Sequence, residues 1–193
     1  MKKTCVYISI FLFCFHVFSQ EPNGPVIALH EYRKYLLDKN LVMPKEAYFK
    51  DVDGILNQYI GTWIGTRNSI TYEFVISKHL EHYRKVAMDI LKIRYKITNQ
   101  NGEVIATNYN ETINNSMIID GNYPTFDKKY YNFTYRGYNM ECGQSGSVNL
   151  KNEISDPNKI QLVLMVTGGS WSTCEGEDAE QVLPTQWLTI TKQ

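Results

Sequence analysis

Alternation of apolar and polar residues is the feature that most constrains how this chain can fold. In the segment ILKIRYKIT, residues 90–98, every second residue from Leu91 to Ile97 is apolar and the residues between them are charged. A period of two predicts a β-strand with one buried and one solvated face. The sequence NQNG that follows at residues 99–102 is typical of a tight turn, so residues 103–109 are predicted to form the second strand of a hairpin.

Similar strand-like segments recur along the chain, separated by short turns. They span residues 61–67, 70–77, 115–119, 129–136, 146–154, 160–166 and 186–191. Parallel neighbours need crossovers of a dozen or more residues, so this spacing predicts an all-β antiparallel meander of about eight or nine strands. Such a meander must protect its edges, and closure into a barrel and folding into a sandwich both remain open.

Three segments depart from the strand pattern. Residues 29–41 have apolar side chains at helical spacing, and we expect a short helix there. Residues 51–60 suggest another short helix at the mouth of the barrel, although Gly54 weakens it. Residues 167–182 are rich in glycine and acidic side chains and are predicted to be a loop.

The first residues have the layout of a secretory signal peptide. Lys2 and Lys3 precede an apolar run at residues 5–18, and the polar stretch QEPNGP follows. We expect cleavage after Ser19. The alternatives are an uncleaved anchor, for which the run is shorter than the roughly 20 residues that a span needs, and lipidation of Cys14, which bulky Phe13 disfavours.

This cleavage divides the chain into three parts and sets its location. We expect a signal peptide at 1–19, an N-terminal extension with a short helix at 20–47, and a barrel-like domain at 48–193. The mature protein would lie in the periplasm or outside the cell, with no membrane span.

The charge balance argues against one class of partner. The sequence has 20 Lys and Arg and 20 Asp and Glu, and loss of Lys2 and Lys3 leaves 18 basic residues. A nucleic-acid-binding protein usually carries a basic excess, so no nucleic acid is expected as a partner. The hydrophobic content of 43% is too high for a disordered chain.

Two of the four cysteines survive signal cleavage. Cys142 and Cys174 have no histidine or second cysteine at metal-ligand spacing. Because exported proteins mature in an oxidising compartment, an even pair predicts a disulfide.

Several segments together suggest a family. They are YFKDVDGILNQYIGTWIGT at residues 48–66, the dipeptides Cys142-Gly143 and Thr173-Cys174, and the ending LPTQWLTITKQ. In order and spacing, residues 45–193 resemble an uncharacterised family of small exported Bacteroidetes proteins, known only as a domain of unknown function. The resemblance implies export, a β-fold and a disulfide, and it implies no activity.

A shorter motif is similar to the Gly-x-Trp signature of lipocalins. Gly61-Thr62-Trp63 opens a predicted strand after a short helical turn. This resemblance implies that Trp63 packs across the base of an eight-stranded barrel. The Thr-Asp-Tyr motif of lipocalins and the arginine of their last strand are absent.

Residues with catalytic or metal-binding chemistry are few. His79, Glu81 and His82 form an H-x-E-H cluster, and in a helix its two histidines would share one face and could bind a metal, but the surrounding pattern favours a strand end and a loop. The acidic residues of 175–180 lack the ligand pattern of an EF-hand. No Gly-x-Ser-x-Gly elbow, phosphate loop or dinucleotide fingerprint occurs. The sequence therefore predicts no catalytic residue, no metal and no cofactor.

Aromatic side chains on strands give the one positive indication of a function. Inward-facing rings can line a pocket for an apolar ligand, and they can equally form a packed core. The hypothesis is a non-enzymatic exported domain that binds a small apolar ligand or an envelope protein, with a cavity lined by Trp63, Phe74, Tyr95, Phe133 and Trp187. The alternatives are a secreted hydrolase that uses paired carboxylates and a structural component of the envelope.

Overall fold

The computed structural model describes residues 22–193 except 84, 126–128 and 153–154. The predicted signal peptide and its cleavage site lie outside the described residues. The N-terminal elements are β1 (Val26–Ala28), a 3₁₀ turn (Leu29–Glu31), α1 (Tyr32–Leu37), β2 (Tyr48–Lys50) and a second 3₁₀ turn (Asn57–Tyr59). The remaining strands are β3 (Gly61–Arg67), β4 (Ile70–Tyr83), β5 (Val86–Thr98), β6 (Val104–Thr107), β7 (Ile119–Pro124), β8 (Tyr130–Arg136), β9 (Ser145–Asn152), β10 (Lys159–Val166) and β11 (Leu188–Lys192).

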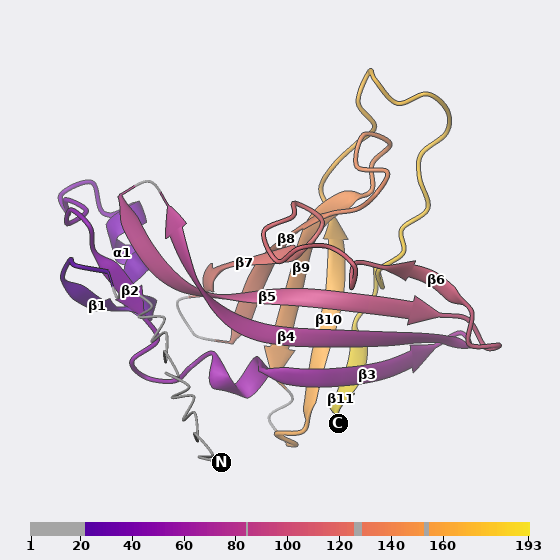
Figure 1. The fold of residues 1–193 in the computed structure, drawn as a ribbon, viewed down its shortest axis with the longest axis horizontal. Coiled ribbons are helices and arrows are strands. Elements are labelled where there is room, and N and C mark those ends of the chain that lie inside the picture. Colours follow the sequence, from indigo (N-terminus) through magenta and orange to yellow (C-terminus); the bar gives the residue numbers. More distant parts are fainter. Residues whose placement is uncertain (1–21, 84, 126–128, 153–154) are drawn as a thin grey trace, which may run out of the picture.

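Eight of the strands form a closed antiparallel barrel (Figure 1). Around the barrel they run β3, β4, β5, β7, β8, β9, β10 and β11, and the last strand pairs with the first at Thr191 and Ile64. The predicted all-β antiparallel fold is confirmed, and the barrel is the architecture that forms. Closure removes the free edges that a meander of this length would otherwise expose.

Strand β5 has one edge that three other strands share. Its opposite edge pairs with β4 along the whole of β5. On the shared edge, β2 pairs in parallel at Ala87 and Met88, β7 closes the barrel at Lys92 and Ile93, and β6 pairs at residues 96–98. The strand β7 therefore closes the barrel through a short stretch of pairing, with extra strands on both sides of it.

Glycine at position 121 permits the close approach that this closure needs. A Cβ there would lie 2.5 Å from the carbonyl oxygen of Leu91 and 2.7 Å from the ring of Tyr131. The Tyr131 hydroxyl instead accepts a 3.2 Å hydrogen bond from the backbone N–H of Leu91. The strand predicted at residues 115–119 is displaced, because residues 115–118 form turns and β7 begins at Ile119 and continues through Gly121.

The hairpin of β4 and β5 extends beyond the barrel and supports the N-terminal segment. In Figure 1, β1, α1 and β2 lie together against the far ends of β4 and β5. Phe49 of β2 packs against the rings of Tyr32 and Tyr35, with centroids 4.8 and 5.7 Å apart. Leu29 is buried in the same core cluster as the barrel residues, so the described part of the N-terminal extension, residues 22–47, contributes to the packed structure.

Short helical structure forms where it was expected, with different extents. The helix predicted within 29–41 is present as α1. The helix predicted over 51–60 is reduced to a 3₁₀ turn. Gly54 interrupts the helix at a positive φ of 66°, and the Asp51 carboxylate holds the turn there by accepting hydrogen bonds from the N–H groups of Ile55 and Leu56 at 2.7 and 3.1 Å.

Large side chains occupy the interior of the barrel. Trp63 is fully buried, and its indole N–H donates a 2.8 Å hydrogen bond to the carbonyl oxygen of Tyr59. Gly61 supplies the positive φ of 136° at which the chain enters β3. The buried inward-facing set includes Trp63, Tyr72, Phe74, Ile93, Tyr95, Tyr131, Phe133, Tyr135, Val148, Leu150, Leu162 and Ile190.

Candidate binding surface at the disulfide end of the barrel

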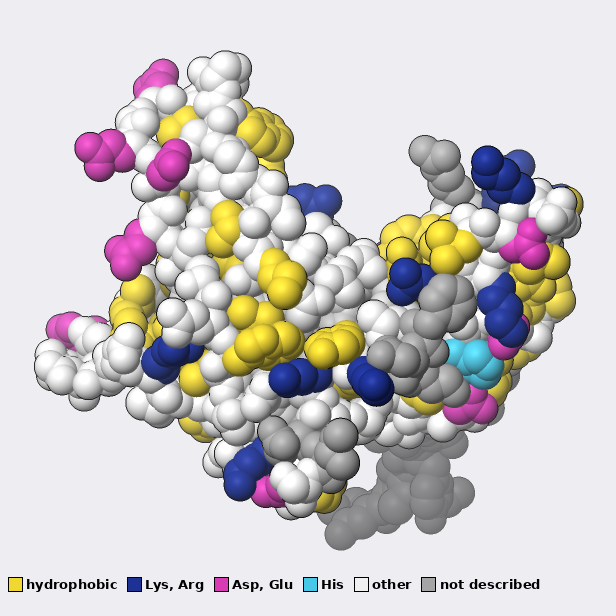
Figure 2. Space-filling view, turned by 180° about the vertical axis from the view of Figure 1, so that it is seen from behind, with side chains coloured by type: hydrophobic (Ala, Val, Ile, Leu, Met, Phe, Trp, Pro, Cys, Tyr) yellow, Lys and Arg dark blue, Asp and Glu magenta, His cyan; other side chains and the backbone are white. Residues whose placement is uncertain are grey.

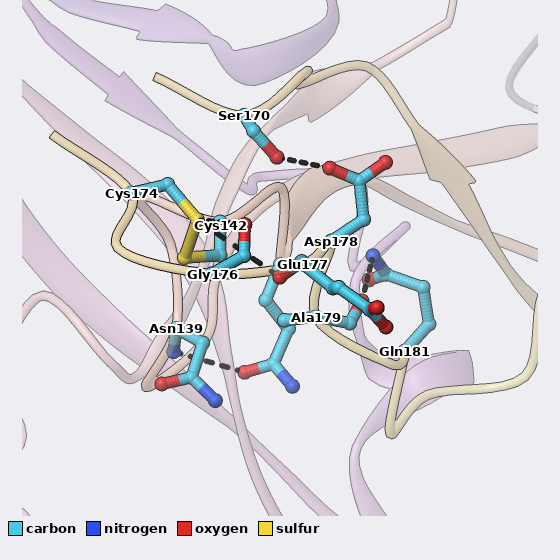
Figure 3. The surroundings of a disulfide bond; sticks show 10 residues. Asn139, Cys142, Ser170, Cys174, Gly176, Glu177, Asp178, Ala179 and Gln181 are labelled. Atoms are coloured by element: carbon cyan, nitrogen blue, oxygen red, sulfur yellow. Dashed lines mark hydrogen bonds between the residues drawn. A yellow bond between two sulfur atoms is a disulfide. The ribbon is translucent and has the colours of Figure 1, made fainter. Parts of the chain in front are cut away.

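A disulfide joins two loops at one end of the barrel (Figure 3). Cys142 lies between β8 and β9, Cys174 lies after β10, and their Cα atoms are 5.0 Å apart. The predicted pairing is confirmed. The bond ties the long loop of residues 167–187 to the shorter loop of residues 137–144, and we call these two loops together the disulfide end.

Hydrogen bonds between the two loops reinforce the disulfide. The backbone N–H of Trp171 donates to the carbonyl oxygen of Glu141 at 2.7 Å, and that of Ala179 donates to Cys142 at 2.8 Å. The side-chain amide of Gln144, which is buried, donates to the carbonyl oxygen of Glu180 at 2.8 Å. The segment predicted to be a loop is therefore irregular in backbone yet fixed to its neighbour at several points.

Three pockets formed by described residues surround this end, with volumes of about 640, 370 and 200 Å³. The largest and the second share Tyr138 and Asn139, and the largest and the third share Arg136 and Met140. The pockets are thus neighbours around the loop that carries Cys142. The largest lies between that loop, the disulfide and residues 115–117.

Exposed apolar side chains frame these pockets. Tyr138 is 57% exposed and Trp171 is 54% exposed, and each lines a pocket. Val104 and Ile105, which line the second pocket, are also exposed. Figure 2 shows hydrophobic side chains over this face, between the protruding loop and the barrel wall. Single exposed apolar side chains are normal on a protein surface, whereas a group of them is typical of interaction surfaces.

The charge of this end is acidic. Figure 2 shows acidic side chains on the protruding part of the molecule. The exposed carboxylates of the two loops belong to Glu141, Glu175, Glu177, Asp178 and Glu180. Ser170 donates a hydrogen bond to Asp178, and Arg136 supplies a positive charge in the rim of the pockets. A cationic partner would therefore be attracted to this end.

The residues predicted to line a ligand cavity fall into two groups. Trp63, Phe74, Tyr95 and Phe133 meet in the barrel core, each at most 1% exposed. Trp187 is 38% exposed on the outer wall, because the next residue, Leu188, faces inward. None of the three pockets formed by described residues is lined by any of the five. Their role in holding a ligand stays a prediction.

Trp187 has its own surroundings on the outer wall. Its ring lies 6.4 Å from that of Tyr130, and the Lys151 ammonium lies 4.5 Å from its centroid. This cation–π contact and the neighbouring ring account for its position without a ligand.

A buried lysine joins two carboxylates on the outer wall of β5. The Lys92 side chain is 4% exposed, and its ammonium lies 2.8 Å from Glu81 and 3.4 Å from Asp120. It also donates to the carbonyl oxygen of Ile113 at 3.2 Å. Burial raises the pKa of Asp120, and the charge of Lys92 opposes that shift. The ion-paired lysine therefore holds the segment of residues 108–118 against β5 through the carbonyl group of Ile113.

The histidines of the H-x-E-H cluster separate, as expected for a strand. His79 and Glu81 lie on one face of β4, and His82 lies on the other. Burial lowers the pKa of His79, which is 2.8 Å from the hydroxyl of Ser77. Within the described residues, no group of three or more histidine, cysteine, aspartate or glutamate side chains could hold a metal ion.

Two buried aspartates have structural partners. Asp89 accepts hydrogen bonds from the Tyr48 hydroxyl at 2.7 Å and from the Asp51 backbone N–H at 2.8 Å. The oxygens of Asp51 are bonded to the turn that follows it. Each carboxylate is thus hydrogen-bonded within the fold, as is usual for buried polar groups.

Comparison with known proteins gives a family. A family model matches residues 1–193. The chain belongs to DUF6705, a family of unknown function. No curated protein and no solved structure matches this DUF6705 chain. Among its described residues, no helix is long and apolar enough to cross a membrane.

The surface residues of this DUF6705 chain were not identified from its sequence. Tyr138, Met140 and Trp171 lie in loops, where no periodic pattern shows which side chains face outward. The predicted disulfide was the only sequence signal for this end, because it indicated that the two loops meet.

Proposed function

We propose that this protein is an exported, non-catalytic binding domain that takes a partner polypeptide at the disulfide end of its barrel. One observation carries the proposal: three neighbouring pockets meet around the loop of Cys142 and are framed by exposed Tyr138 and Trp171. Binding residues are often found on loops that a rigid scaffold holds in place.

The composition of the surface supports a polypeptide as the partner. Tyrosine, tryptophan, methionine and arginine are enriched at protein interfaces, and Tyr138, Trp171, Met140 and Arg136 line these pockets. The pockets also carry backbone and amide groups, for example at Asn139, that can bond to a peptide. A small apolar ligand would instead favour the barrel interior, where the core residues are already closely buried.

Export is the second part of the proposal. The disulfide is the kind of bond that persists in oxidising compartments. The basic and apolar N-terminal sequence supports secretion. Identification of the mature N-terminus by mass spectrometry of protein from its own host tests this part, and retention of residues 1–19 would refute it.

The binding part is tested with a random peptide library displayed on phage and selected on the oxidised protein. Peptides enriched on the wild type are expected to lose at least about tenfold in affinity on Trp171→Ser and Tyr138→Ser, as for central aromatic anchors. Trp187→Ser is the matched control, because Trp187 is exposed but lies outside the three pockets. Peptides that bind the Trp171 and Tyr138 variants as well as the wild type would refute the site.

A second readout separates polypeptide from small ligand. Native mass spectrometry of the protein from its own host is expected to show the bare mass of the chain after gentle purification. A retained small molecule would favour the barrel-interior alternative.

A further inference from the structure

We infer that the outer edge of β6 is the docking edge, to which the partner adds as an extended strand. This inference rests on the proposed function and specifies its mode. Strand β6 pairs with β5 on one side, and no other described strand pairs with it. An unpaired edge offers backbone N–H and C=O groups to an incoming chain, which is the basis of strand addition.

A groove of suitable size runs along this edge. The second pocket, of about 370 Å³, has the β6 residues 104–107 on one wall and Tyr138, Asn139, Gln144 and Val182 on the other. A strand rises about 3.3 Å per residue, so the edge of β6 accommodates roughly four residues of an added strand. A bulge opposite Ile97 and Thr98 shortens the regular part, so we expect a short segment to pair.

The hydrogen-bond pattern shows which backbone groups point into the groove. The backbone N–H of Asn108 donates to the carbonyl oxygen of Tyr95 at 3.1 Å, and Thr107 is the residue paired with Lys96. Bonded residues alternate in an antiparallel pair, so Thr107 directs its backbone away from β5. Its carbonyl oxygen accepts a 3.1 Å hydrogen bond from the Tyr138 hydroxyl. The outer edge of β6 therefore already accepts a hydrogen bond from a group outside the sheet.

The side chains of β6 lack the usual protection of an edge strand. Val104 is 56% exposed and Ile105 is 50% exposed, and β6 contains no lysine and no proline. Natural edge strands are commonly blocked by such residues. The other described strand with a single neighbour, β1, follows Pro25 directly and lines none of the three pockets. Of these two edge strands, β6 is therefore the better site for an added strand.

Charge indicates the chemistry of the occupant. The carboxylate of Glu111 lies 3.3 Å from the Tyr138 hydroxyl, Glu103 directly precedes β6, and Glu180 is bonded through its carbonyl oxygen to Gln144. The residues that line the groove include no lysine or arginine. The occupant that fits is an extended peptide with alternating apolar residues that pack on Val104 and Ile105, flanked by lysine or arginine.

The experiment compares two pairs of variants of the full oxidised chain. The probes are the best peptide from the phage selection and a synthetic peptide of alternating valine and threonine with two lysines at each end. Val104→Lys with Ile105→Lys is expected to weaken binding by at least about tenfold, because charge on an edge blocks pairing. Met165→Lys with Val166→Lys, which changes two exposed residues of β10, is expected to change affinity by less than about threefold.

A peptide-side test detects backbone pairing directly. N-methylation of single peptide amides is expected to weaken binding strongly at every second position and weakly at the positions between, because only alternate N–H groups bond to a neighbouring strand. Hydrogen exchange should slow at the amide of Thr107 when the peptide binds. Thermal unfolding of each variant confirms that it is folded.

The outcomes separate the two proposals. If no peptide is enriched on the protein, the proposed function fails. If peptides bind and are lost on Trp171→Ser, but the lysine pair on β6 and the alternate N-methyl groups have no effect, the proposed function stands and the β6 docking edge is refuted.

Discussion

The backbone N–H of Tyr95 donates a 2.6 Å hydrogen bond to the side-chain oxygen of Asn108. Tyr95 lies on the stretch of β5 between the residues that pair with β7 and those that pair with β6. The amide nitrogen of the same side chain donates to the carbonyl oxygen of Met117 at 2.9 Å and lies 3.4 Å from that of Ile93. One fully buried asparagine thus takes the place of strand pairing where β7 and β6 leave a gap.

Substitution of Asn108 is predicted to be strongly destabilising. Asn108→Ala leaves the Tyr95 N–H and the Met117 carbonyl group buried without a partner, and we expect a loss of about 2–4 kcal/mol in the free energy of unfolding. Urea unfolding followed by tyrosine and tryptophan fluorescence measures it. The exposed Asn110→Ala serves as control and should change stability by less than about 0.5 kcal/mol. Equal stability of the two variants would contradict the role of Asn108.

Loss of the disulfide is predicted to lower stability and to weaken peptide binding. Cys142 and Cys174 are separated by 32 residues, and the chain-entropy model gives roughly 3–4 kcal/mol for a loop of this length. Cys142→Ser with Cys174→Ser should unfold at correspondingly lower urea, with or without reductant. The urea midpoint of the wild type should approach that of the variant when reductant is added. A wild-type midpoint that does not change on addition of reductant would argue against the disulfide.

Removal of the buried lysine is predicted to cost more than removal of an exposed one. Lys92→Met leaves Glu81 and Asp120, each about one-third exposed, facing one another without their shared cation. We expect a loss of about 1–3 kcal/mol, less than for a fully buried pair because water reaches both carboxylates. Lys96→Met is the matched control, since its ion pair with Glu73 is 3.4 Å long and more exposed, and it should cost less than about 1 kcal/mol.

Because several tyrosines are buried, we predict that the protein unfolds at alkaline pH. Burial raises the pKa of Tyr59 to about 12 from its ordinary 10.0, and burial also raises the pKa of Tyr131. Because the pKa is higher in the folded state than in the unfolded state, the buried phenol contributes fully to the free energy of unfolding below pH 10. This contribution is lost as the pH rises toward 12. Ultraviolet difference absorbance should show these phenols ionising together with the loss of tertiary structure detected by circular dichroism. Ionisation near pH 10 of every tyrosine in a still-folded protein would contradict this.

The regular part of the fold could be predicted from local pattern. β3 was predicted with its bounds, because GTWIGTR lies between clear turn residues and alternates inward and outward side chains. β8 and β10 were predicted within one residue at each end for the same reason. The barrel was one of two expected architectures, since alternation gives the buried face of each strand but not the strand that it pairs with.

The remaining strands depend on tertiary contacts that local pattern does not contain. Residues 78–83 are mostly polar and were expected to end in a loop, yet β4 continues to Tyr83 because β5 pairs with it throughout. The sequence IDGNYP contains turn residues, and β7 forms there because Gly121 admits the ring of Tyr131. The docking surface was harder still to predict from the sequence, because it lies in loops that are held by the disulfide and by hydrogen bonds to backbone carbonyl groups.

The disulfide encloses β9 and β10 in a covalent loop, which determines what happens when a protease cuts the chain within it. A single cut in the turn at residues 155–158 would separate the chain into two polypeptides. The larger would keep Cys142 and the smaller would keep Cys174, so the two would stay joined and the strands would stay paired. A nicked molecule would run as one band without reductant and as two bands with it, and it would still present an intact disulfide end.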